Sequence, residues 1–178
     1  MTGTTHEQET TMDLAERVAR LEDLHEIGQL RARYCQLLDD GHWDELAELF
    51  TEDGAFVGLS TARGRDELRT FFPTLQEGSL EAWWHFSSNE TIDLDGDEAT
   101  GQTWLDQPCV VDGVAHIAAG RYADRMRRCD DGRWRFVERK VTFFFWSPLA
   151  TGWASGRFDH EAARAAADPR TLERRADH

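Results

Sequence analysis

The stretch Ile27-Gly-Gln-Leu-Arg-Ala-Arg-Tyr34-Cys-Gln-Leu-Leu-Asp39-Asp40-Gly-His-Trp43 decides how this chain should fold. Apolar residues recur in it at steps of three and four, and the same spacing extends back to Leu14. That spacing predicts one long helix that begins near Met12 and buries an apolar stripe. Gly41 is the expected end of the helix, because glycine readily adopts the left-handed backbone that terminates helices. The helix would therefore finish beside a carboxylate, either Asp39 or Asp40.

Short elements are expected directly after this helix. Turn-forming residues separate short apolar runs, which favours a second helix, a short strand and a third helix that stops near a proline. The expected bounds are Trp43–Phe50 for the second helix, Thr51–Gly54 for a turn, Ala55–Leu59 for the strand, and Gly64–Phe72 before Pro73 for the third helix.

The second half of the sequence is typical of long antiparallel strands. The predicted strands are Trp84–Leu94, Glu98–Val111, Val114–Arg128 and Trp134–Trp146, separated by Asp- and Gly-rich turns around positions 95–97, 112–113 and 130–132. Helices followed by a meander of strands indicate the α+β class. A curved antiparallel sheet wrapped around the N-terminal helices would leave a pocket at its open mouth.

Length and composition are compatible with one folded domain, residues 12–153, and two tails. The chain has 178 residues, of which 40% are hydrophobic, and this supplies a core for a single domain. Residues 1–11 are polar and are predicted to be disordered, and residues 154–178 to form a tail with a short helix near 159–167. Seven Trp and ten Phe also provide enough rings to line an apolar ligand pocket.

Charge and cysteine usage exclude several classes of function. The formal net charge of −14 argues against binding to nucleic acid or to anionic membranes, since both require Lys and Arg. Three cysteines without CxxC spacing predict neither a disulfide framework nor a zinc site. Without a signal sequence or a membrane-spanning apolar run, the expectation is a cytoplasmic protein. No nucleotide-binding or nucleophile-elbow motif is present, which leaves acid–base chemistry without a cofactor.

Several short motifs together resemble one family. They are Tyr34-Cys-Gln-Leu-Leu-Asp39, Trp43-Asp-Glu-Leu-Ala-Glu-Leu-Phe50-Thr-Glu-Asp-Gly54, Gly64-Arg-Asp-Glu-Leu68, His85-Phe-Ser-Ser-Asn89 and Asp131-Gly-Arg-Trp134-Arg-Phe136. Their order and spacing, from Met12 to Trp153, resemble the SnoaL-like branch of the nuclear transport factor 2-like superfamily. The resemblance implies a cone-shaped α+β barrel.

Within that branch the motifs are most similar to those of scytalone dehydratases, hexachlorocyclohexane dehydrochlorinases and bile-acid 7α-dehydratases. These enzymes remove HX from a ring with a His–Asp dyad and no cofactor. The resemblance implies that His85 is the general base, that Asp39 orients it, and that Tyr34 lies in the site. A carboxylate in such a dyad holds the imidazole tautomer and stabilises its protonated form.

Each of these residues also has a structural interpretation. His85 could be a structural histidine at the start of a strand, Tyr34 a core tyrosine on the apolar stripe, and Asp40 the acid at a solvated helix end. The expected substrate-binding residues are Asn89, Trp104, Asp106 and His116, with Arg121 and Arg139 inward only if strand register allows it. The family's second aspartate aligns nearer Gln107 than Asp106, and a shift of one residue changes the face of a strand.

The resulting functional hypothesis is a lyase or isomerase that acts on a small apolar ring compound, polyketide- or steroid-like. The alternatives are a polyketide cyclase or hydratase of natural-product biosynthesis, and a non-catalytic binding or assembly module. A hydrogen-bonded dyad that faces a closed cavity would favour catalysis. A homodimer or homotrimer is expected from the superfamily, with apolar positions around Phe143, Phe144 and Phe145 exposed for assembly.

Overall fold

A computed structural model describes residues 12–77 and 80–151. It contains three α-helices, seven strands and a short 3₁₀ helix, within the described ranges. They are α1 (Leu14–Asp40), α2 (Trp43–Glu48), β1 (Phe50–Val57), β2 (Thr61–Arg63), α3 (Arg65–Thr74), β3 (Leu80–Trp83), β4 (Phe86–Asp95), β5 (Glu98–Val111), β6 (Val114–Arg128), β7 (Trp134–Pro148) and η1 (Leu149–Thr151). The predicted tails and the predicted helix near 159–167 lie outside the described residues.

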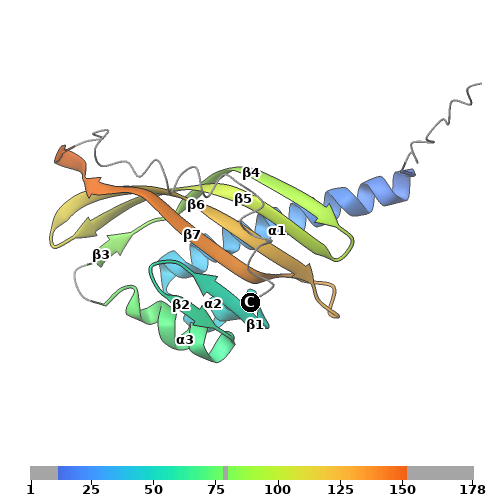
Figure 1. Cartoon of the computed structure of the whole chain (residues 1–178), viewed down its shortest axis with the longest axis horizontal. Helices are drawn as coiled ribbons and strands as arrows, with labels where there is room; N and C mark the ends of the chain where they lie inside the picture. The colour runs from blue at the N-terminus through green and yellow to red at the C-terminus, as the bar shows by residue number, and fades with distance from the viewer. Residues whose placement is uncertain (1–11, 78–79, 152–178) are drawn as a thin grey trace, which may run out of the picture.

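Helix α1 has well-defined ends. Asp13 caps its first turn in a reciprocal capping box with Glu16. Gly41 ends it with φ of 74°, and His42 donates its backbone N–H to the Leu37 carbonyl at 2.9 Å. This confirms the predicted stop at Gly41 and leaves Asp39 in the last turn. The first turns of α1 project beyond the sheet (Figure 1), so Leu14 and Leu21 are exposed there.

The strands form one curled mixed sheet that curves around α1 (Figure 1). Its order is β2-β1-β7-β6-β5-β3, and β4 also pairs with β5. The three long strands β5, β6 and β7 form an antiparallel meander, as predicted. The α+β class is confirmed, although β1 runs parallel to β7, so the sheet is not wholly antiparallel. Helices α2 and α3 pack beside β1 and β2 at one end of the sheet (Figure 1).

The outer edge of the sheet is interrupted at Trp84 and His85. Strands β3 and β4 both pair with β5, through Trp83 opposite Cys109 and Phe86 opposite Asp106. Trp84 donates its backbone N–H to Pro108 at 3.1 Å, but Pro108 has no N–H to donate in return. The ladder is therefore broken at this point. His85 lies between two strands and not at the start of one, which corrects the predicted Trp84–Leu94 strand.

One other local prediction is wrong. The segment Thr51–Gly54 belongs to β1, where the register with β7 shifts between Phe50 and Ala55, so the predicted turn is an irregularity inside a strand. Helix α3 ends at Thr74, one residue after Pro73, which confirms the predicted stop near that proline.

Candidate active site

Asp39 and His85 form a close hydrogen-bonded pair. The Asp39 Oδ1 lies 2.5 Å from Nδ1 of His85, and Oδ2 accepts the backbone N–H of His85 at 3.0 Å. The His85 side chain is 5% exposed and that of Asp39 is 17% exposed, so solvent screens the pair little. Asp40 is exposed on the solvent side of the helix end. The structure thus selects Asp39 over Asp40 as the neighbour of His85.

The break in the sheet edge explains this geometry. The backbone N–H of His85 belongs to an edge and points away from β5, toward the end of α1 that carries Asp39. One carboxylate can therefore bind both the backbone and the ring of the same residue. Because Nδ1 is occupied by a carboxylate, it carries the proton in the neutral imidazole, and Nε2 keeps its lone pair. His85 is thus held in the tautomer that can act as a base through Nε2.

His85 lines an apolar cavity of about 160 Å³. Most of the wall is aromatic or aliphatic, and the polar groups in it come from only a few residues. The lining residues are Tyr34, Leu38, Phe56, Leu59, Ser60, Phe71, Leu75, Leu80, Trp83, His85, Gln107, Tyr122, Val141, Phe143 and Trp146. An apolar pocket with a few convergent polar groups is the usual form of a small-molecule site.

Tyr34 is both a core residue and a cavity residue, so the two sequence-based interpretations are compatible. Its ring packs edge-on against Phe50, Phe72, Tyr122 and Phe136, with centroids 5.8–6.3 Å apart. Burial raises the pKa of Tyr34 well above its ordinary value, and the Arg139 charge opposes that rise only in part. The hydroxyl therefore remains protonated and can serve the cavity as a hydrogen-bond donor.

A buried arginine lies under the two cavity tyrosines. The Arg139 Cζ is 4.1 Å from the ring centroid of Tyr34 and 3.9 Å from that of Tyr122. Asp124 lies 3.7 Å from Arg139 Nε and accepts a 3.0 Å hydrogen bond from Arg31, and all three side chains are buried. Among the described residues, no guanidinium nitrogen of Arg139 has a hydrogen-bond partner. The register thus places Arg139 inward, as the sequence hypothesis allowed.

The four predicted substrate-binding residues do not line this cavity. Trp104 and Asp106 lie on the exposed face of β5, opposite to the buried face of Leu105 and Gln107. Asn89 is exposed, with φ of 52°, at the bulge where β4 shifts register against β5. His116 donates its Nδ1–H to the carbonyl oxygen of Val114, two residues away, at 2.8 Å.

The outer face of the sheet also holds Arg121 and Phe144, which both contact Trp104 there. Arg121 stacks on Trp104, with Cζ 4.1 Å from the ring centroid. Phe144 and Phe145 are each 2% exposed, and Phe143 lines the cavity, so these phenylalanines are not exposed for assembly. Trp84 and Phe86 are the exposed aromatic residues beside the dyad. A homodimer or homotrimer stays a prediction.

Gln107 and Trp83 are cavity residues that sequence reasoning did not select. Both are buried in the wall next to His85, and Trp83 packs against the His85 ring with centroids 5.2 Å apart. The alignment of the family's second aspartate near Gln107 was the available signal. It pointed to Gln107, with Asp106 one residue away, and only the strand register could decide between the two.

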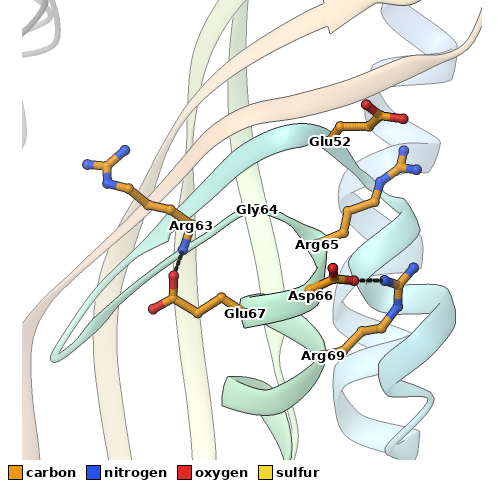
Figure 2. A pocket seen from close by; sticks show the side chains of 7 residues that line it. All are labelled: Glu52, Arg63, Gly64, Arg65, Asp66, Glu67 and Arg69. Atoms are coloured by element: carbon orange, nitrogen blue, oxygen red, sulfur yellow. Dashed lines mark hydrogen bonds and ion pairs between the residues drawn. The ribbon is translucent and has the colours of Figure 1, made fainter.

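A larger hollow of about 550 Å³ lies at the start of α3 (Figure 2), and neither Asp39 nor His85 lines it. Arg63, Arg65 and Arg69 surround it together with acidic side chains. Arg65 and Arg69 bind Glu48 at 2.8 and 2.6 Å, and Arg69 also binds Asp66 at 2.8 Å. In this charged hollow Arg65 and Arg69 take part in surface ion pairs, which stabilise little.

Within residues 12–77 and 80–151, no group of three His, Cys, Asp or Glu side chains could hold a metal ion. No helix there is long and apolar enough to cross a membrane.

Comparison with known proteins identifies related sequences and structures. The model of the SnoaL-like domain matches residues 19–140. A candidate scytalone dehydratase from Novosphingobium aromaticivorans is 25% identical, with a TM-score of 0.66, over 72% of this chain and 89% of that chain. A nuclear transport factor 2-like protein of cystatin-like fold from the same organism is 28% identical, with a TM-score of 0.60, over 88% and 97% of the two chains.

A third structure shares the fold at lower identity. The hexachlorocyclohexane dehydrochlorinase of Novosphingobium barchaimii is 19% identical, with a TM-score of 0.69, over 75% of this chain and 94% of that chain.

Proposed function

Because the chain belongs to the SnoaL-like domain family, we propose that it is a cofactor-independent lyase that acts on a small, largely apolar ring compound. The observation that carries the proposal is the Asp39–His85 pair, which opens on an aromatic-lined cavity. A hydrogen-bonded dyad facing a cavity favours catalysis over a non-catalytic binding module. The similarity to a candidate scytalone dehydratase supports elimination as the reaction type.

The dyad supplies the base of the proposed elimination. Nε2 of His85 removes a proton from a ring carbon, and the electrons of the C–H bond form the new C=C bond. The leaving group X departs with the electrons of the C–X bond and takes the proton from the imidazolium, so that HX is released and neutral His85 is restored. Asp39 stabilises the imidazolium while it exists and keeps its ring in place.

The tyrosines supply the second part of the proposed chemistry. Negative charge develops on the substrate when the proton is removed, for example on a carbonyl oxygen beside the carbanion. A protonated Tyr34 can donate a hydrogen bond to that oxygen in a water-poor cavity, where such bonds are strongest. Because burial raises its pKa, Tyr34 acts in this proposal as a hydrogen-bond donor and not as a proton donor.

The size of the cavity limits the substrate. A closed apolar cavity of roughly 150 Å³ holds a benzene molecule. The cavity beside His85, at about 160 Å³, thus accommodates one ring with small substituents, and a larger molecule would extend through the open side.

The test measures turnover of β-hydroxycyclohexanones, whose dehydration produces an enone with a new ultraviolet absorbance. We expect His85→Ala and Asp39→Asn each to lower the rate by about 10²–10⁴, since that is the usual contribution of a positioned acid–base group. Asp40→Asn is the matched control, because Asp40 is adjacent but exposed. Folding of each variant is checked by circular dichroism. Turnover that survives both dyad substitutions would contradict the proposal.

A further inference from the structure

We infer that Gln107 and Trp83 form a hydroxyl-recognition site in the cavity wall, so that the ring compound bound there carries a hydroxyl group. This inference rests on the proposed function for the location of the substrate. It adds the polar group that the substrate must have and the two side chains that select it.

Both side chains carry buried polar atoms without a partner. Gln107 is 2% exposed and Trp83 is 7% exposed. The Gln107 Oε1 and the Trp83 Nε1 have no hydrogen bond to any described residue. A buried polar atom without a partner usually costs the fold about 1–3 kcal/mol, so such atoms are rare in folded proteins. Two of them in the wall of one cavity indicate that a ligand supplies the missing bonds.

The two groups are close together on the same wall. Trp83 of β3 is opposite Cys109 of β5, and Gln107 lies two residues from Cys109 on the same buried face. Trp83 and Gln107 are therefore diagonal neighbours, which is within reach of long side chains. His85 packs against Trp83. A substrate group bound by the pair would thus lie next to the base.

The hydrogen-bonding types of the two atoms are complementary to one functional group. The Gln107 Oε1 accepts a hydrogen bond, and the Trp83 indole N–H donates one. A hydroxyl can donate to the first and accept from the second at the same time. An ether or a halogen has no proton for Gln107, so it would leave that oxygen unpaired. The pair should therefore discriminate alcohols, phenols and enols from their O-methyl or halogenated analogues.

The test compares the binding of p-cresol and 4-methylanisole by calorimetry. They have the same ring and differ only in that a methyl group replaces the hydroxyl proton. We expect the native protein to bind p-cresol tighter by on the order of tenfold to a hundredfold, the range that corresponds to one unpaired buried group. Gln107→Leu should remove most of that preference, and Trp83→Phe should reduce it.

Matched controls separate this effect from loss of folding. Asp106→Asn changes the next residue of β5, on the exposed face, and should leave the preference unchanged. Gln107→Met, which is unbranched and similar in length, is the second variant if Gln107→Leu does not fold, as judged by thermal melting. Equal binding of both compounds by the native protein, no binding of p-cresol at millimolar concentration, or an intact preference in the Gln107 variants would overturn the inference.

The outcome is independent of the catalytic proposal, because binding is measured without turnover. If the dyad variants keep their turnover but the preference holds, only the proposed function fails. If the preference is absent while the dyad variants lose turnover, only the hydroxyl site fails.

Discussion

The cavity beside His85 and the charged hollow at the start of α3 differ in how their polar groups are satisfied. In the hollow, which is the larger, Arg65 and Arg69 each bind carboxylates in open solvent. In the cavity region, Gln107, Trp83 and Arg139 are buried and have hydrogen-bonding atoms without partners among the described residues. The hollow is the larger of these two regions, but unsatisfied hydrogen bonding selects the cavity as the functional site.

The physical reason lies in the surroundings of each group. Water satisfies and screens exposed charges, so an ion pair in the hollow gains little and its loss costs little. No water replaces a missing partner inside an apolar core, where a polar group keeps its full desolvation cost. A fold that retains such groups carries a cost that a bound ligand can remove. The difference between the two regions can be tested in three ways.

Removal of one carboxylate from each region should produce the largest contrast. Asp124→Ala leaves Arg139 buried without a counter-charge and leaves Arg31 with the half-exposed Glu90 as its remaining carboxylate partner, and should lower the free energy of unfolding by about 3–5 kcal/mol. Glu48→Ala removes the shared partner of Arg65 and Arg69 in the hollow, and should cost less than about 1 kcal/mol. Urea unfolding at neutral pH measures both, and a similar cost for the two variants would remove the distinction.

High pH should destabilise the cavity region through its tyrosines. Burial raises the pKa of Tyr34 and Tyr122, the only two tyrosines of the chain. The unfolded chain loses these protons near pH 10, whereas the folded chain retains them. Their contribution to stability is therefore complete below pH 10 and is lost as the pH rises above it, by about 1.4 kcal/mol per pH unit for each tyrosine.

Tyrosinate absorbance at 295 nm gives an independent measurement of the same effect. The folded protein should show no tyrosinate signal until it unfolds, because no exposed tyrosine contributes. In the double variant Tyr34→Phe, Tyr122→Phe, the stability should no longer fall with this slope above pH 10. A reversible titration near pH 10 in the folded protein would show that the tyrosines are not as buried as the structure has them.

Salt should produce the smallest of the three contrasts. At 1 M NaCl the Debye length falls to about 3 Å, so the small cost of Glu48→Ala should decrease to nearly zero. The cost of Asp124→Ala should persist, because its partners are buried and salt does not reach them. Urea unfolding of both variants with and without 1 M NaCl checks this. Equal salt sensitivity would mean that solvent reaches Asp124.

The long strands and the dyad could be predicted from sequence, for separate reasons. The bounds of β5 and β6 follow from long alternating runs that end at Asp-Gly turns, because these signals are local. The Asp39–His85 contact came from the order of motifs, and no local signal contains it. Strands β2 and β3 have three and four residues, too few for alternation to be recognised, and were not predicted.

The rest of the site depended on strand register, which a single sequence does not contain. Asp106 and Gln107 are neighbours, and only the pairing of β5 shows that the amide faces the cavity and the carboxylate faces outward. For the same reason, the sequence could not decide which of Arg121 and Arg139 faces inward. Asn89 was selected by its parity with His85, but the bulge after Ser88 shifts the register against β5 and disturbs that parity.

The double hydrogen bond from Asp39 to His85 also has a consequence for folding kinetics. It joins residues 46 positions apart, so it can form only after the end of α1 has docked on the sheet edge. The site therefore forms when the tertiary structure forms, and the helix and strands alone do not create it. A partly folded chain whose helix and strands have formed, but whose α1 has not docked on the sheet, would be inactive. The rate at which activity recovers during refolding would therefore report the rate of docking.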